Sequence, residues 1–308
     1  MMIWREVTAE DLSECLQIAS RHVGDELVGR SAALQIWRTL AQSPMFRSAV
    51  LECTGPGKVP RICGFGSSVF VSSRFADREL ADPKPFLNSR VIASIAENTS
   101  VVLSQKGLST CNEGAGLDVI IFGGVWLSEG LTSEQVRQAQ MLLPAGFAET
   151  HVGYKLNRIF SEAIGQVQRN YLTSSGVWRV VKDLAGTDRS LFLLNSESAF
   201  SVSGSVAALL FQYEAPILDL RDADKHLLSE TLQGGTDAEI ARRMNLALVS
   251  VKKRWQSLFE RITEDQPGLL HDSECRLSEG TRGPQKRHHI LAYVRSHPQE
   301  LRPYKCPR

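Results

Sequence analysis

The side chains best placed to do chemistry form a basic cluster between Leu220 and Ile262. Lys252, Lys253 and Arg254 follow one another at the start of an expected helix, and Arg242 and Arg243 end the helix before it. Ammonium and guanidinium groups in such positions bond to phosphate oxygens and base edges in duplex DNA. The pattern therefore predicts double-stranded DNA as the partner, bound through Thr236, Arg242, Arg243, Ser250, Val251, Lys252, Lys253 and Arg254.

Three short helices are expected to position these side chains. The first spans residues 222–233 and ends at Gly234-Gly235, where glycine tolerates the left-handed backbone of a helix C-terminus. Thr236 and Glu239 have the spacing of a capping box and open the second. The third spans residues 250–262, and its apolar spacing predicts one buried face. This succession is typical of a helix-turn-helix, whose later helix enters the major groove.

Residues 220–262 resemble the LuxR/GerE-type helix-turn-helix family. The matching residues are Leu220, Leu227-Leu228, Gly234, Thr236, Glu239-Ile240-Ala241, Ser250-Val251-Lys252, Leu258-Phe259 and Arg261-Ile262. The resemblance implies that Thr236 and Ser250 bond phosphates, that Val251 touches a thymine methyl, and that Lys252 and Arg254 read guanine edges or nearby phosphates. It also implies phosphate contacts for Arg242, Arg243 and Lys253. No clear match to the family's fourth, dimerising helix follows Ile262, so a homodimer remains open.

The first 210 residues predict a mixed α/β domain. A hairpin is expected where residues 49–53 and 61–72 flank a glycine- and proline-rich turn. Residues 117–127 are continuously apolar, as in a strand buried on both faces. Helices are expected over 86–97 and 149–171, and further strands over 177–181, 191–194 and 207–212.

This domain resembles the GNAT acyltransferase fold in the segments Arg5–Leu12 and Cys63–Gly66. GNAT enzymes hold the acyl-CoA pyrophosphate on a glycine-containing loop at the start of a long helix. We place that loop at Glu149–Tyr154, where only Gly153 is retained. The resemblance implies a degenerate GNAT-like domain or an α/β sensor. Its alternative is an acyl-CoA-dependent N-acyltransferase with an accessory helical domain.

No catalytic set can be assembled from spacing alone. His151 lies within an expected helix, where a surface or capped imidazole is the common outcome, and no base stands in a recognisable relation to Ser67 or Ser68. The six cysteines show no Cys-x-x-Cys and are expected to be free, mostly buried thiols. Two of them fall near three histidines, but the spacings fit no common zinc pattern, so no metal site is predicted: Cys275, His288, His289, His297 and Cys306.

Composition is ordinary for a globular chain, with 43% hydrophobic and 22% charged residues and a net charge of +1. The charge is uneven, because residues 273–308 hold eight Lys or Arg against three Glu. No signal peptide or membrane span is evident, which predicts a cytoplasmic protein. We expect an α/β domain over 1–213, an all-α helix-turn-helix over 214–265 and a basic extension with one helix over 266–308. The predicted function is a transcriptional regulator without enzymatic activity or cofactor, controlled by a small-molecule or protein signal.

Overall fold

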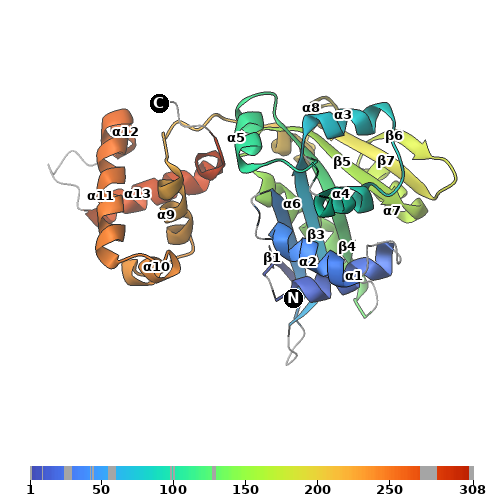
Figure 1. Ribbon diagram of the computed structural model, residues 1–308, viewed down its shortest axis with the longest axis horizontal. Helices are drawn as coiled ribbons and strands as arrows, with labels where there is room; N and C mark the ends of the chain where they lie inside the picture. The colour runs from blue at the N-terminus through green and yellow to red at the C-terminus, as the bar shows by residue number, and fades with distance from the viewer. Residues whose placement is uncertain are drawn as a thin grey trace. The chain divides into compact units, whose positions relative to one another are not determined.

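The computed structural model describes residues 2–304 except 9, 24–29, 42, 44, 55–59, 98, 100, 127–129 and 271–282. The chain divides into two compact units, Met1–Gln212 and Tyr213–Arg308 (Figure 1). The first unit is built on a mixed sheet and the second consists of helices. Each unit is described by itself below.

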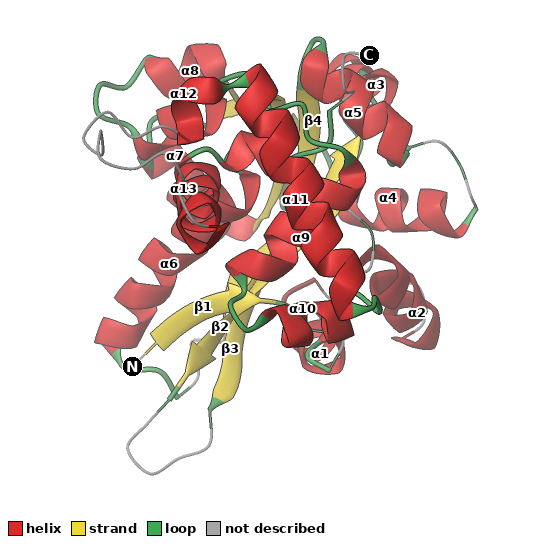
Figure 2. Cartoon of the chain, turned by 90° about the vertical axis from the view of Figure 1, so that its left-hand side faces the viewer, coloured by secondary structure: helices red, strands yellow, loops and turns green. Residues whose placement is uncertain are grey.

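One seven-stranded sheet organises the first unit. Its strands are β1 (Met2–Glu6), β2 (Phe46–Cys53), β3 (Arg61–Val71), β4 (Leu117–Trp126), β5 (Leu156–Ile164), β6 (Arg179–Leu184) and β7 (Arg189–Asn195). They lie in the order β1-β2-β3-β4-β5-β7-β6, and Figure 2 shows β1, β2 and β3 side by side. The β4–β5 pair is parallel, whereas the other five pairs are antiparallel. The predicted mixed sheet with flanking helices is confirmed.

Helices cover both faces of this sheet. Alternating residues of β2 show the two sides, because Val50 packs in one core with α1, α2 and α4 and Leu51 packs in another with α6. Figure 1 shows α1, α2 and α4 in front of the strands and α6 behind them. The helices of the unit are α1 (Leu12–Val23), α2 (Arg30–Ala41), α3 (Ser73–Ala81), α4 (Leu87–Ala96), α5 (Gln105–Glu113), α6 (Ser133–His151), α7 (Gly165–Ser174), α8 (Ser196–Phe200) and the 3₁₀ turn η1 (Val206–Phe211).

Two predicted elements are wrong. The expected helix over 149–171 is instead the end of α6, strand β5 and helix α7. Gly153 and Gly165 separate these elements with φ values of 84° and 70°, a left-handed backbone that glycine adopts without strain. The expected strand over 207–212 is the 3₁₀ turn η1. The predicted hairpin and the helix over 86–97 are present as β2–β3 and α4.

In the second unit, α9 (Asp222–Leu232), α10 (Asp237–Arg243) and α11 (Leu248–Asp265) form where the sequence predicts three helices. They are followed by α12 (Pro267–Leu270), α13 (Gly283–Ser296) and the turn η2 (Pro298–Leu301). Ile290 and Val294 of α13 are buried in the same core as α9–α11. Glu300 accepts backbone N–H bonds from Ile217 at 2.8 Å and Leu218 at 3.0 Å. Helix α13 and the turn η2 are therefore part of this unit's core.

Among the described helices, none combines the length and apolar character that a membrane crossing requires. Cys15, Cys53, Cys63 and Cys111 are free thiols, as predicted. Burial raises the pKa of the Cys15 and Cys63 thiols to about 12. Cys275 and Cys306 lie outside the described residues.

Candidate active site

The sheet of the first unit opens between its two parallel strands. Pairing between β4 and β5 extends to Ile121 and Ser161 and is not continued beyond them in the described chain. β4 nevertheless pairs with β3 as far as Trp126, and β5 pairs with β7 as far as Ile164. A register shift between Ser67 and Ser68 accompanies the change, as expected where a bulge bends a strand. Beyond this point, the edges of β4 and β5 that face each other form no β-ladder hydrogen bonds with one another in the described chain.

A cavity of about 460 Å³ lies at this divergence. This volume is within the usual range for a pocket that encloses a small organic molecule. Both strands contribute to its wall, with Ile121 and Phe122 from β4 and Ser161 and Glu162 from β5. Most of the remaining wall is apolar and comes from β2, α6, α7, η1 and their neighbours: Val50, Leu51, Leu142, Leu143, Phe147, Ala148, Leu172, Val177, Trp178, Leu194, Val206, Ala207 and Leu210.

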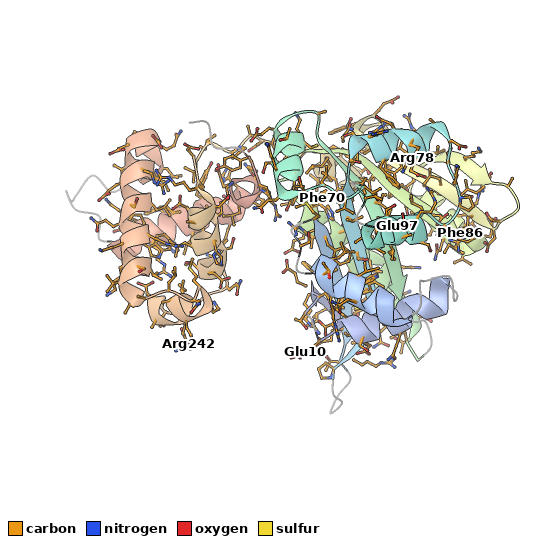
Figure 3. The ribbon with its side chains drawn as sticks, viewed as in Figure 1. Glu10, Phe70, Arg78, Phe86, Glu97 and Arg242 are labelled. Carbon is orange, nitrogen blue, oxygen red and sulfur yellow. The ribbon has the colours of Figure 1, made fainter. Side chains whose placement is uncertain are left out.

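The best-organised polar group in this wall is a serine–histidine pair. Ser68 Oγ lies 2.8 Å from His151 Nε2, and both residues are only 1% exposed. The other ring nitrogen, Nδ1, lies 2.7 Å from the carbonyl oxygen of Phe147. The Phe147 ring stacks on the imidazole at 4.0 Å between centroids, and Phe70 of β3, labelled in Figure 3, meets it edge-on at 5.7 Å. The imidazole is thus held in one orientation.

Two further polar atoms of the cavity wall find no hydrogen-bond partner among the residues that the structure describes. One is Ser67 Oγ, whose residue is 4% exposed, and the other is Asn88 Oδ1. Asn88 Nδ2 donates to the carbonyl oxygen of Phe122 at 2.9 Å, which ties α4 to the open edge of β4. Buried polar atoms without partners are costly. Polar groups of a bound molecule would satisfy these two.

Glu162 is a structural carboxylate, although it borders the cavity. Its two oxygens accept the N–H groups of Phe86 and Leu87 at 2.7 and 3.1 Å, and the Arg189 guanidinium donates to it at 3.1 Å. Burial raises the pKa of Glu162, and Arg189 opposes that effect. Phe86, labelled in Figure 3, carries a φ of 65°, and Arg189 lies over its ring at 4.4 Å. Glu162 therefore fixes the start of α4.

Tyr171 brings a phenol to the cavity wall from α7. It is 39% exposed, and its hydroxyl lies 3.4 Å from the carbonyl oxygen of Gln140. Burial of the phenol raises its pKa, so the group is protonated at neutral pH. A protonated phenol therefore borders the cavity.

The glycine-containing loop predicted at Glu149–Tyr154 is misplaced. Residues 149–151 are the last turn of α6, and the following turn leads directly into β5. The segment before α6 includes residues 127–129, which lie outside the described chain. Thr132 caps α6 in a capping box with Gln135. The Arg61 guanidinium donates to the carbonyl oxygen of Gly130 at 3.2 Å.

The basic residues that the sequence singled out belong to the second unit, and none of them is among the residues that line the cavity. Arg242, Lys252 and Lys253 are exposed, and Arg242 is labelled in Figure 3. Arg254 and Ser250 are half-buried. The hydroxyl of Thr236 is engaged in the capping box of α10.

Two of the side chains that were predicted to contact DNA make their contacts within the second unit instead. Val251 is 0% exposed in the core, so its methyl groups are not available to a thymine. Arg243 donates to the Glu230 carboxylate at 2.8 Å and to the carbonyl oxygens of Glu230 and Gly234 at 2.6 and 2.8 Å. Its guanidinium joins α10 to the end of α9.

No family model and no curated protein matches this chain. Solved structures that resemble it include FeeM, an N-acyl amino acid synthase from uncultured soil microbes. It is 10% identical with a TM-score of 0.36, over 69% of this chain and 99% of that one. Another is FdhC, a nucleotide-linked sugar GNAT, which is 9% identical with a TM-score of 0.36 over 68% and 94% of the two chains. An uncharacterised protein from Bacillus halodurans is 14% identical with a TM-score of 0.35, over 64% and 85%.

These comparisons correct the predicted function. Two of these structures are named as an N-acyl amino acid synthase and a nucleotide-linked sugar GNAT. The prediction of a LuxR/GerE-type transcriptional regulator is therefore wrong, and so are the predictions of a DNA partner and of a protein without enzymatic activity. The seven-stranded sheet with one parallel pair agrees with the GNAT-like fold that the first unit was seen to resemble.

Proposed function

We propose that this protein is an acyltransferase that moves an apolar acyl group from a thioester, such as acyl-CoA, to an amine. The observation that carries the proposal is the position of the cavity, which enters the sheet where β4 and β5 separate. An acyl chain needs an apolar enclosure, and a thioester carbonyl needs hydrogen-bond donors at its oxygen. The cavity offers the apolar enclosure, and the unpaired edges of β4 and β5 offer the hydrogen-bond donors.

The backbone of β4 supports this chemistry. Beyond Ile121 its edge toward β5 has no β-ladder partner there in the described chain, although β3 continues to hold the strand from the other side. N–H groups fixed in this way are already oriented, so they polarise a carbonyl without further ordering. Asn88 holds the carbonyl of Phe122 at this edge and limits its movement.

Tyr171 supports the departure of the thiol. When the carbon–sulfur bond breaks, a thiolate is released and takes up a proton. A phenol that remains protonated at neutral pH is a suitable source. Tyr171 borders the cavity on α7 and is exposed enough to regain a proton from water.

The direct test is acyl transfer by the purified full chain. Octanoyl-CoA is mixed with a panel of amino acids and amines, thiol release is followed with a colorimetric thiol reagent, and the amide is identified by mass spectrometry. Thiol release that depends on an amine and yields the matching amide is expected. Absence of amide formation with acyl donors of short, medium and long chain would overturn the proposal.

Tyr171→Phe provides a matched variant. It retains the ring and removes only the hydroxyl, so binding of the acyl donor should be unchanged while kcat falls by roughly 10²-fold. Tyr293→Phe in the second unit is the control and should leave acyl transfer unaffected. Equal kcat values for Tyr171→Phe and the natural chain would remove Tyr171 from the proposal.

A further inference from the structure

Ser68 has the surroundings of an activated hydroxyl. A backbone carbonyl only accepts hydrogen bonds, so the 2.7 Å contact between His151 Nδ1 and the Phe147 oxygen requires the proton on Nδ1. In the neutral ring Nε2 is then the acceptor, and the Ser68 hydroxyl donates to it at 2.8 Å. Ser68 is thereby hydrogen-bonded to a base, His151, and the Phe147 carbonyl orients that base.

The pair lies in the wall of the acyl cavity. Ser68 belongs to β3 and His151 to the last turn of α6, and both border the cavity. The neighbouring Ser67 alternates to the other face of β3 together with Phe65 and Val69, so Ser68 is the hydroxyl that meets the imidazole.

We propose that Ser68 accepts the acyl group covalently, with His151 as its general base, so that transfer to the amine proceeds through an acyl-serine ester. This inference rests on the proposed acyltransferase function and deepens it. It replaces a direct attack of the amine on the thioester by two successive acyl transfers.

The two steps balance as follows. In the first, Ser68 Oγ bonds to the thioester carbon, the carbon–sulfur bond breaks, and the serine proton moves to His151 Nε2. The thiolate takes its proton from Tyr171, and the tyrosinate is reprotonated from water. In the second, the amine nitrogen bonds to the ester carbon and the carbon–Oγ bond breaks. His151 returns its proton to Ser68, and the excess proton of the amine passes to water.

The enclosed site favours an acyl-serine ester that resists hydrolysis until an amine binds. Ser68 and His151 are nearly inaccessible to solvent, and apolar side chains make up most of the surrounding wall. Exclusion of water suppresses hydrolysis of a reactive acyl intermediate. An acceptor amine is then the preferred nucleophile in the second step.

p-Nitrophenyl octanoate tests the inference without any knowledge of the natural acceptor. With the full chain and no amine, a rapid burst of about one nitrophenolate per protein molecule is expected, followed by a much slower phase. Mass spectrometry of the quenched protein should show one octanoyl group on the peptide that contains Ser68. Absence of both the burst and the adduct would overturn the inference.

Three variants separate nucleophilic from structural roles. Ser68→Ala should lose the adduct, and Ser68→Cys should regain one as a thioester that neutral hydroxylamine cleaves. His151→Gln can still accept a hydrogen bond from Ser68 but is not a base, so the burst rate should fall by roughly 10³-fold. Ser201→Ala, at an exposed serine, is the matched control for labelling. Thermal unfolding confirms that each variant is folded.

The inference and the proposed function can fail separately. Amide formation from octanoyl-CoA without any acyl-serine, with the Ser68→Ala variant fully active, would retain the acyltransferase and exclude the covalent route. Acylation of Ser68 that proceeds only to hydrolysis would retain the activated serine and overturn transfer to amines.

Discussion

Asp118 of β4 and Arg158 of β5 stand opposite one another in the sheet's parallel pair and join their side chains through two hydrogen bonds, at 2.7 and 2.8 Å. The Asp118 carboxylate is fully buried and also accepts from Asn157 at 3.0 Å. This pair holds β4 to β5 three positions before their pairing ends. It therefore fixes the point from which the two strands diverge around the cavity.

Asp118→Asn should destabilise the protein by about 3 kcal/mol, because it leaves a largely buried guanidinium without its main counter-charge. Urea unfolding monitored by circular dichroism measures the change. Asp77 is the control: it bonds to the same guanidinium at 2.7 Å, but its side chain is 67% exposed. Asp77→Asn should cost less than about 1 kcal/mol. Equal losses for the two variants would contradict this account.

Gly116, directly before β4, offers a backbone test at the same place. Its φ is 97°, and a Cβ atom there would lie 3.0 Å from the carbonyl oxygen of Lys155. Gly116→Ala combines a left-handed backbone with a backbone clash and should cost about 2 kcal/mol or more. Gly186 has a φ of 77°, and no atom of the described residues lies within 4 Å of the added atom. Gly186→Ala should cost about 1 kcal/mol. The difference between the two variants measures what the backbone clash at Gly116 contributes.

Asp11 leads to a prediction about how the stability of the fold depends on pH. Hydrogen bonds from Arg5 at 2.7 and 2.9 Å lower the pKa of the Asp11 carboxyl to about 2, below its ordinary value of 3.8. Because the folded-state pKa is depressed, the ionised carboxylate stabilises the fold above pH 3.8, and this contribution is lost as the pH falls toward 2. A shift of this size corresponds to about 2 kcal/mol.

Asp11→Asn should therefore be less stable than the natural chain by about 2 kcal/mol at pH 6. The difference should shrink between pH 4 and pH 2. Urea titrations at several pH values provide the curve. Glu10→Gln, one position earlier on an exposed side chain, is the matched control and should leave the stability at pH 6 unchanged. A constant difference between Asp11→Asn and the natural chain over this range would show that Asp11 acts by packing alone.

Local signals predicted much of the fold. The hairpin β2–β3 follows from strand-like runs around turn residues, and α9, α10 and α11 follow from caps and apolar spacing. The DNA-binding role predicted for α9, α10 and α11 was wrong, because a helical pattern specifies packing and does not specify a partner. The same spacing that suggests a recognition helix places Val251 in the core.

The error over residues 149–171 has a different physical cause. Leu156, Ile159, Phe160 and Ala163 belong to a strand that is buried on both faces, so it shows no alternation and its apolar positions happen to match a helical spacing. The two glycines with positive φ at its ends were the available signal. With the helix misassigned, His151 was expected on a helix surface. Its contact with Ser68 depends on a tertiary pairing over 83 positions, which no local pattern contains.

The apolar wall predicts control of acyl-chain length. Ala207 of η1 borders the cavity and is half-buried, so a larger side chain there would occupy part of the space without entering the core of the sheet. Ala207→Phe should lower kcat/KM for a long-chain acyl-CoA by roughly 10-fold or more and affect a short-chain donor much less, because only the longer chain needs that space. Ala208→Phe is the matched control, since Ala208 is half-buried but does not border the cavity. A uniform fall in kcat/KM across all chain lengths would place the acyl group elsewhere.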